Sequence, residues 1–240
     1  MLYLHTNLSP LVGKDQGSPT SVGLFFIIMK KKKVIVYVDG FNFYYGLKSF
    51  KSRRNWKKYY WLDIVKLFEQ FMKKDQELVR VKYFSAKSTD VQKNKRQDAL
   101  FQANKENPKF QLILGKYLSK NKTCNQCGYI IRSFEEKESD VRLATQILHD
   151  IYKKECDVSI VVSADSDMVP VVEICKELNH PTYVYFPPNQ FSSNLQNMCN
   201  AIKLDRYESR FQKSLLEDVV ILNSTKYELH IPEKWEAYKQ

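Results

Sequence analysis

The most informative stretch of this sequence is Lys33-Val34-Ile35-Val36-Tyr37-Val38-Asp39-Gly40-Phe41-Asn42. Residues 33–39 form a nearly continuous apolar, β-branched run, which is typical of a strand buried on both faces. Such strands belong to parallel sheets that are covered by helices. The Asp39-Gly40 step ends the strand, and residues 41–50 are expected to begin a helix. The run therefore predicts a β-α unit at the start of an α/β domain.

The rest of the chain repeats this alternation. Apolar runs predict further strands at 78–86, 110–114, 158–162, 182–186 and 202–204, and helical spacing predicts helices at 62–72, 89–107, 139–152, 169–178 and 193–199. Asp90 is a plausible N-cap for the helix at 89–107. Strands that alternate with helices indicate a three-layer α/β/α, Rossmann-like fold with a mainly parallel central sheet. A small cysteine-containing hairpin insertion is expected at about 116–136.

The 240 residues are enough for one main domain with appendages. We expect a poorly ordered N-terminal extension at 1–28, the domain itself at 29–205, and a C-terminal tail at 206–240 that packs on it. The longest apolar stretch, 22–29, is too short to span a bilayer and is followed by a run of lysines, so no membrane partner is predicted.

Five cysteines form an odd and mostly scattered set, unlike a secreted disulfide framework, and this favours a reducing, cytoplasmic location. Cys124 and Cys127 have the spacing of half a zinc ribbon, but a complete Zn²⁺ site needs two further ligands. Two interpretations stay open. A homodimer could complete the zinc site, or the two thiols simply sit in a hairpin turn.

Charge is unevenly distributed along the chain. Residues 1–122 carry 25 Lys and Arg against 9 Asp and Glu, a balance of +16, whereas residues 123–240 carry 13 against 18, a balance of −5. The basic half suits a polyanion, because each phosphate contact releases counterions. Interleaved aromatic residues could stack on bases or pack inward. The basic residues chosen as candidate RNA contacts are Arg53, Arg54, Lys57 and Lys58.

Acidic residues follow two of the predicted strands. Asp39 ends the first strand, and Asp165 and Asp167 follow the strand at 158–162, while Asp140 lies at a helix start. Because the carboxyl ends of parallel strands share one edge of a sheet, we expect these carboxylates to converge. Each alone could be a helix cap. Together they indicate a site for Mg²⁺ or Mn²⁺, hard cations that take oxygen ligands and relieve the repulsion between carboxylates.

Four ordered motifs also resemble a known family: Val38-Asp39-Gly40-Phe41-Asn42, Glu136-Lys137-x-x-Asp140-Val141, Val162-Ser163-x-Asp165-Ser166-Asp167 and Val184-Tyr185-Phe186-Pro187-Pro188. The set is similar to NYN-domain proteins of the LabA/DUF88 group, relatives of PIN-domain nucleases, over about residues 33–205. The resemblance implies a PIN-like fold and Mg²⁺- or Mn²⁺-dependent cleavage of RNA, single-stranded or structured.

The resemblance also assigns roles to individual residues. It implies that Asp39, Asp140, Asp165 and Asp167 form the ligand set, that Asn42 positions a phosphate or a ligating water, and that Ser163 orients a carboxylate or the substrate. Ala164 departs from the glycine usual in relatives but removes no ligand. Lys137 could neutralise charge on a phosphate, or pair with the glutamates around it at the surface.

Other function classes fit less well. A phosphatase with an aspartyl nucleophile needs a second acid two residues after the first-strand aspartate, and position 41 is phenylalanine. Dinucleotide binding needs a G-x-G-x-x-G motif, which is absent from the sequence. A non-catalytic RNA-binding or regulatory module with the same fold remains the main alternative to a metal-dependent ribonuclease.

Overall fold

The computed structural model describes residues 30–49, 51, 54–123, 125–223 and 225–239. Its centre is a sheet of six strands: β1 (Lys32–Asp39), β2 (Gln76–Ser85), β3 (Phe110–Leu114), β6 (Val158–Val162), β7 (Thr182–Phe186) and β8 (Asn200–Lys203). The strand order is β3-β2-β1-β6-β7-β8, and every neighbouring pair is parallel. The predicted parallel α/β class is confirmed, and all six strands end at the same edge.

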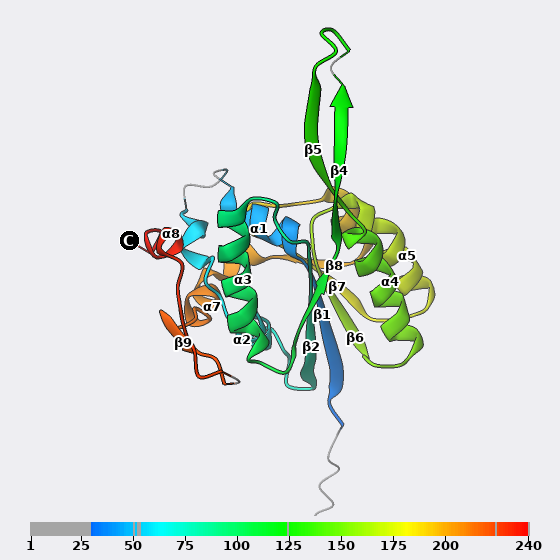
Figure 1. Ribbon diagram of the computed structural model, residues 1–240. Coiled ribbons are helices and arrows are strands. Elements are labelled where there is room, and N and C mark those ends of the chain that lie inside the picture. The colour runs from blue at the N-terminus through cyan, green and yellow to red at the C-terminus, as the bar shows by residue number, and fades with distance from the viewer. Residues whose placement is uncertain (1–29, 50, 52–53, 124, 224, 240) are drawn as a thin grey trace, which may run out of the picture.

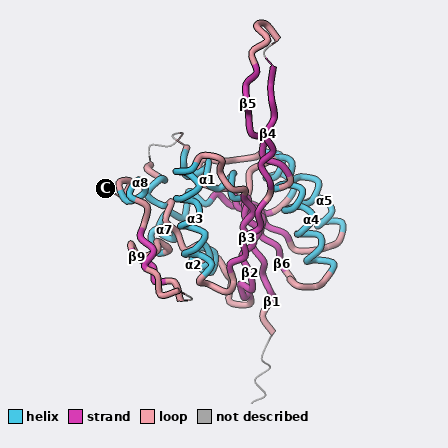
Figure 2. Tube along the Cα trace, in the orientation of Figure 1, coloured by secondary structure: helices cyan, strands magenta, loops and turns pink. Residues whose placement is uncertain are grey.

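Helices cover both faces of the sheet, which makes three layers (Figure 1). One face carries α1 (Gly40–Lys48), α2 (Ile64–Glu69) and α3 (Val91–Lys105), and the other carries α4 (Ser139–Tyr152) and α5 (Val169–Glu177), with α6 (Ser193–Met198) packed against α5. Figure 2 shows the strands gathered between these two groups of helices. Asp90 caps α3, as predicted, because its side chain accepts a hydrogen bond from the Lys93 N–H.

The central strand β1 supplies two separate cores. Val34, Val36 and Val38 belong to the core under α1–α3, whereas Ile35 and Tyr37 belong to the core under α4–α6. Successive side chains of a strand point to opposite faces, so a strand between two helical layers must be apolar at every position. This requirement explains the unbroken apolar run from 34 to 38.

A long antiparallel hairpin, β4 (Lys116–Thr123) and β5 (Ile130–Lys137), stands out from the carboxyl edge of the sheet (Figure 1). It lies where the insertion was expected. Of the two cysteines proposed for zinc, Cys124 lies outside the described residues and Cys127 is an exposed free thiol. Zinc therefore gains no support from the described part of this hairpin.

The aromatic residues that follow α1 are core residues. Trp56 and Tyr59, in the short helix η1 (Trp56–Tyr59), and the neighbouring Tyr60 and Trp61 are all less than a tenth exposed. The interpretation that these rings stack on RNA bases is wrong for them, because they are buried inside the protein. Burying a large aromatic surface against another part of the chain stabilises the fold more than leaving that surface exposed to solvent.

That partner surface comes from the end of the chain. It is formed by η3 (Leu204–Tyr207), α7 (Glu208–Lys213) and α8 (Glu233–Glu236), together with the small hairpin β9 (Val219–Ile221) and β10 (Glu228–His230). Phe211 packs edge-on against Trp56, with ring centroids 5.2 Å apart, and Trp235 packs against Tyr60 at 5.5 Å.

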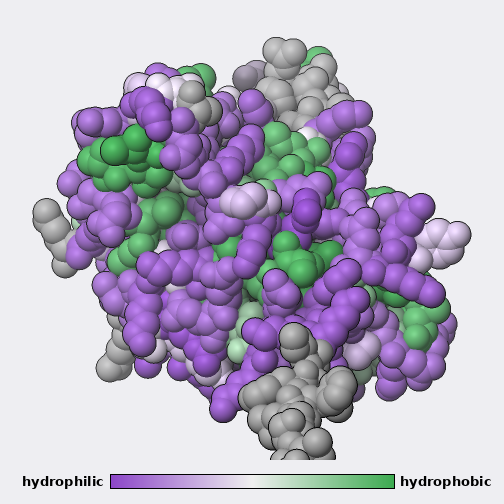
Figure 3. All heavy atoms as spheres, turned by 90° about the horizontal axis from the view of Figure 1, so that it is seen from below, coloured by the Kyte–Doolittle hydropathy of each residue, from purple (hydrophilic) through white to green (hydrophobic). Residues whose placement is uncertain are grey.

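Viewed from below, on the side away from the long hairpin, the described residues are mostly hydrophilic with separate apolar patches (Figure 3). None of the helices in the described segments combines the length and apolar character of a membrane span.

Candidate functional site

Asp39 is the last residue of β1 and also the N-cap of α1. Its Oδ1 accepts a 2.9 Å hydrogen bond from the backbone N–H of Asn42. The next residue must be glycine, because a Cβ on Gly40 would lie 2.4 Å from Cε1 of Tyr83 and 2.5 Å from the carbonyl oxygen of Phe84. The Asp-Gly step therefore lets the chain turn from strand to helix directly against β2.

The neighbouring strand β6 holds this carboxylate from the side. The fully buried hydroxyl of Ser163 donates to Oδ2 of Asp39 at 3.0 Å, and Oγ of Ser163 accepts from the N–H of Asp165 at 3.0 Å. Asn42 closes the ring of bonds, because its Oδ1 accepts from the N–H of Ala164 at 3.0 Å. The tips of β1 and β6 are thus joined by side chains at the very point where the two strands end.

Asp39 is an unusual carboxyl group. It is only 7% exposed, and burial raises its pKa to about 6, with the nearby carboxylates of Asp140 and Asp165 adding to the rise. The hydrogen bonds from Asn42 and Ser163 act in the opposite direction, because they stabilise the ionised form. The net effect is a carboxyl group whose pKa lies above its ordinary value of 3.8.

Asp165 and Asp167 follow β6 but play different parts. Asp165 is the N-cap of the short helix η2 (Ser166–Met168), and its Oδ1 accepts from the N–H of Asp167 at 3.0 Å. Asp165 is half-buried, whereas Asp167 is exposed. Asp39 and Asp165 are linked through Ser163 at the same edge of the sheet, and Asp165 also has the helix-capping role that its position in the sequence allowed.

Asp140 arrives from the opposite side of the sheet, in the first turn of α4. The preceding residue but one, Glu138, has a left-handed backbone with φ of 77°, which is costly for a residue other than glycine. Arg142 holds the Glu138 carboxylate at 2.8 Å, and Lys116 pairs with it at 3.5 Å. Both ion pairs are made by the residue directly before α4, close in the chain to Asp140.

The donor set suits a hard divalent cation in its chemistry. Asp39, Asp140 and Asp165 interact electrostatically, and their mutual repulsion is the kind that Mg²⁺ or Mn²⁺ neutralises. Among the described residues, however, no three His, Cys, Asp or Glu side chains converge closely enough to form a complete metal-binding group. Mg²⁺ keeps several of its waters in proteins, so a site with one or two direct carboxylates fits these residues.

The basic residues proposed as RNA contacts are mostly engaged elsewhere. Lys58 pairs with Glu208 at 3.1 Å, and Arg54 pairs with the same carboxylate at 3.5 Å. The Lys57 ammonium lies 5.5 Å from the ring centroid of Tyr238. Arg53 lies outside the described residues. This cluster therefore joins η1 to the C-terminal segments, since its charges are already partly neutralised there.

Lys137 is the last residue of β5 and is exposed; it is paired in the sheet with Lys116. It lies three residues before Asp140 in the chain, at the base of the long hairpin. This position is compatible with either role expected from sequence, a phosphate contact or a surface ion pair.

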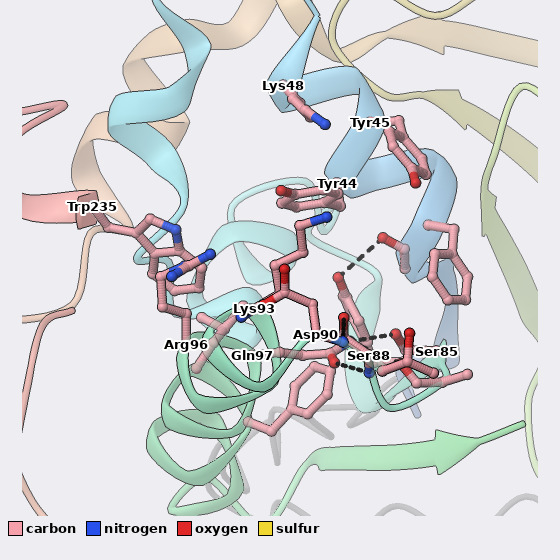
Figure 4. Close-up of a pocket in the computed structure, with 17 residues that line it drawn as sticks. Tyr44, Tyr45, Lys48, Ser85, Ser88, Asp90, Lys93, Arg96, Gln97 and Trp235 are labelled. Atoms are coloured by element: carbon pink, nitrogen blue, oxygen red, sulfur yellow. Dashed lines mark hydrogen bonds between the residues drawn. The ribbon is translucent and has the colours of Figure 1, made fainter. Parts of the chain in front are cut away.

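A cavity of about 260 Å³ lies beside the acidic edge, between α1 and the first half of α3 (Figure 4). Its walls include the aromatic residues Tyr44 and Tyr45 and the cations Lys48, Lys93 and Arg96. These three cations belong to the basic set that the sequence suggests for a polyanion, but they were not among the four residues chosen as candidate RNA contacts. The sequence contained enough information to find two of them. Lys93 and Arg96 lie in the first two turns of the helix that follows β2, and β2 is a neighbour of β1 in the sheet.

Comparisons with known proteins agree with this architecture. A solved structure of a protein of unknown function from Vibrio parahaemolyticus matches with a TM-score of 0.50 and 21% identity, covering 78% of this chain and 97% of that one, which shows a shared fold. A curated relative, 6-hydroxy-3-succinoylpyridine 3-monooxygenase of Pseudomonas putida, is 26% identical over 176 residues, which is 59% of this chain. The chain spans 54% of the length of that relative.

The family model of the NYN domain matches residues 33–205. This range begins in β1, ends just after β8, and contains the whole six-stranded sheet together with the hydrogen-bonded tips of β1 and β6. The chain belongs to the NYN domain family.

Proposed function

We propose that this protein is a metal-dependent ribonuclease that hydrolyses RNA phosphodiester bonds. The observation that carries the proposal is the environment of Asp39: a carboxylate buried at the strand edge, held by two hydrogen bonds and repelled by Asp140 and Asp165. Such a group gains most from a bound cation. Membership of the NYN family, which is PIN-like, supports nuclease chemistry at this edge.

The residues would share the work as follows. Asp39 and Asp165 would hold Mg²⁺ or Mn²⁺ directly, and Asp167, which is exposed, would act through water. When bound, the cation would lower the pKa of a water molecule and stabilise charge on the phosphoryl group. Asp140 would orient the attacking water or hold a second ion. Asn42 uses its Oδ1 on Ala164, and its amide nitrogen remains a donor suited to a phosphate oxygen.

RNA as the substrate rests on charge and on the family. The first 122 residues have a balance of +16, and they include β1, β2 and the cavity cations beside Asp39. An acidic catalytic edge would repel a polyanion unless cations flank it, because unscreened phosphates and carboxylates oppose each other at these distances.

The test is cleavage of 5′-labelled single-stranded and structured RNA, with DNA in parallel, in Mn²⁺, Mg²⁺ or EDTA. We expect cleavage only with the metals, and a loss of at least a hundredfold in Asp39→Asn and Asp165→Asn protein. Lys105→Ala protein, altered at an exposed residue far from the edge, is the matched control and should cleave normally. Full activity of Asp39→Asn would overturn the ribonuclease assignment, and RNA binding without cleavage would favour a regulatory RNA-binding module.

One observation favours a second candidate, an enzyme acting on a small aromatic compound. The curated relative is named for a substituted pyridine, and the 260 Å³ cavity, lined by tyrosines and cations, is of a size for a single ring. Titration with 6-hydroxy-3-succinoylpyridine, followed by isothermal calorimetry, separates the two candidates. Saturable micromolar binding that is lost in Arg96→Ala protein would support the small-molecule enzyme. The absence of any heat of binding up to millimolar concentrations of the compound would exclude that candidate.

A further inference from the structure

We infer that the cavity between α1 and α3 binds one nucleotide of the RNA strand whose neighbouring phosphate lies at Asp39. The inference rests on the proposed function, and it assigns the substrate-positioning subsite of that reaction. A strand that reaches Asp39 would gain a second point of attachment from this cavity.

The cavity is in the right place to provide it. Its lining includes Gly40, the residue directly after Asp39, and Ser85, the last residue of β2. The hydroxyl of Tyr83, another lining residue, donates to the carbonyl oxygen of Gly40 at 3.4 Å. The cavity therefore adjoins the Asp39-Gly40 turn, next to the residue that carries the carboxylate.

The aromatic wall is suited to a base. The Tyr45 side chain is 52% exposed, and its ring meets the Tyr44 ring edge-on at 5.5 Å. Tyr44 is held in turn by Tyr60, with ring centroids 5.3 Å apart and an interplanar angle of 21°. An exposed ring supported by a fixed array is what a stacking platform for single-stranded nucleic acid requires, since little side-chain freedom is lost on binding.

The opposite wall is suited to a phosphate. Figure 4 shows Lys93 and Arg96 reaching from α3 toward the side on which Tyr44 and Lys48 project from α1. Lys93 and Arg96 form no ion pair with a carboxylate of the described residues within 4.0 Å, in contrast to Lys58 at η1. Asp90, which caps α3, is the one carboxylate in the lining, so three cations against one anion leave a charge of +2.

The size of the cavity limits its occupant. Sites for drug-sized ligands measure about 300–1,000 Å³, so 260 Å³ suits a single nucleotide unit better than a dinucleotide cofactor. Opposed aromatic and cationic walls match the two parts of that unit, its base and its phosphate.

The test is binding of a fluorescein-labelled ten-residue oligouridylate, measured by fluorescence anisotropy in EDTA so that the strand is not cut. Lys93→Ala/Arg96→Ala protein should bind at least tenfold more weakly at 0.1 M salt. Its plot of log affinity against log salt should be shallower by about 1.4, because each lost contact with a single strand removes about 0.7. Lys66→Ala/Lys105→Ala protein removes the same charge from exposed sites outside the cavity, and should stay within about twofold of the parent.

A second variant tests the base. Tyr45→Leu keeps apolar volume at an exposed position, and should weaken binding of the oligouridylate by about fivefold or more while leaving an abasic strand of equal length unaffected. If the double alanine variant proves unstable, Lys93→Ala alone, at an exposed residue, should reduce the salt slope by about 0.7.

The outcomes separate the two proposals. Equal weakening by the cavity variant and its control, or none by either, would overturn the cavity as a subsite even if the protein cleaves RNA with Mn²⁺. Selective weakening by the cavity and Tyr45 variants would support the subsite even if no metal promotes cleavage, and would then leave the ribonuclease proposal as the one that failed.

Discussion

The hydroxyl of Ser163 donates a 3.0 Å hydrogen bond to Oδ2 of Asp39, joining two residues that lie 124 positions apart in the chain. The bond crosses between β1 and β6, which are neighbours in the sheet. It is made at the carboxyl ends of both strands, where the candidate metal ligands gather. Four predictions follow from this edge and from the layers that support it.

The first prediction concerns stability against pH in the absence of metal. Asp39 has a pKa of about 6 in the folded protein, above the ordinary value of 3.8. Between these two pKa values the folded state keeps the Asp39 proton while the unfolded state has lost it. The contribution of Asp39 to the free energy of unfolding therefore falls as pH rises from about 4 through 6, by an amount on the order of 2 to 3 kcal/mol.

Urea unfolding in EDTA at pH 4 and pH 8 measures this effect, because these two pH values bracket most of the interval between the ordinary pKa of 3.8 and the raised pKa of about 6. Asp39→Asn protein should lose that part of the pH dependence and be more stable than the parent at pH 8, since an amide carries no charge to bury. An Asp39→Asn protein that is less stable at pH 8 would contradict the assignment of Asp39 as an uncompensated carboxylate. Added Mn²⁺ should stabilise the parent at pH 8 and leave Asp39→Asn nearly unchanged.

The second prediction concerns Ser163→Ala. The substitution removes a hydrogen bond to the ionised form of Asp39, and a bond to a charged group contributes about 1.5–3 kcal/mol. The acidic limb of the activity profile should therefore move to higher pH by about one pH unit or more. Ser163→Thr, which keeps the hydroxyl, is the control, and the profile of kcat against pH in Mn²⁺ is the measurement. An unchanged limb in Ser163→Ala would mean that Asp39 does not limit the rate at low pH.

The third prediction concerns a buried ion pair away from the site. Lys82 on β2, 4% exposed, donates to both oxygens of the fully buried Asp150 at 2.7 and 2.8 Å, and Tyr37 donates to the same carboxylate. Lys82→Met leaves that charge without its cation and should cost about 3–5 kcal/mol in urea unfolding.

A matched surface pair provides the comparison. Lys32 and Asp75 lie 3.2 Å apart with both side chains more than half exposed, and Lys32→Met should change stability very little. Adding Asp150→Asn to Lys82→Met should recover part of the loss, because the uncompensated charge is then gone. Equal effects of Lys82→Met and Lys32→Met would show that burial does not control the strength of this pair.

The fourth prediction concerns Gly40→Ala. The new Cβ would lie 2.5 Å from the carbonyl oxygen of Phe84, which is backbone inside a sheet and cannot rotate away. Overpacking of this kind costs about 1–3 kcal/mol and would also displace Asp39, so both stability and activity should fall. Gly128→Ala, where no atom lies within 4 Å, carries only the strain of its φ of 69° and should leave activity intact. Normal activity of a folded Gly40→Ala protein would show that the geometry of this turn does not control the position of Asp39 in the site.

Much of the fold was predictable from local pattern. Strands β3, β6 and β7 and helix α4 have the predicted bounds, because each is a short, mostly apolar run or a clear 3.6-residue repeat. The aromatic cluster at 56–61 was ambiguous, since interleaved lysines and rings occur both on RNA-binding surfaces and on the rim of a core. Its burial depends on Phe211 and Trp235, more than 150 residues later in the chain.

The candidate site also has a part that could be predicted from the sequence and a part that depended on the tertiary structure. Sequence alone determined that Asp39 and Asp165 end parallel strands, and parallel strands end at one edge, so their convergence follows from local pattern and topology. Only the tertiary structure decided which cations face that edge. Arg54 and Lys58 are paired with Glu208, whereas Lys93 and Arg96 line the cavity beside Asp39. Side-chain charge is visible in a sequence, but its neutralisation depends on contacts between residues far apart in the chain, and these exist only after the layers have packed.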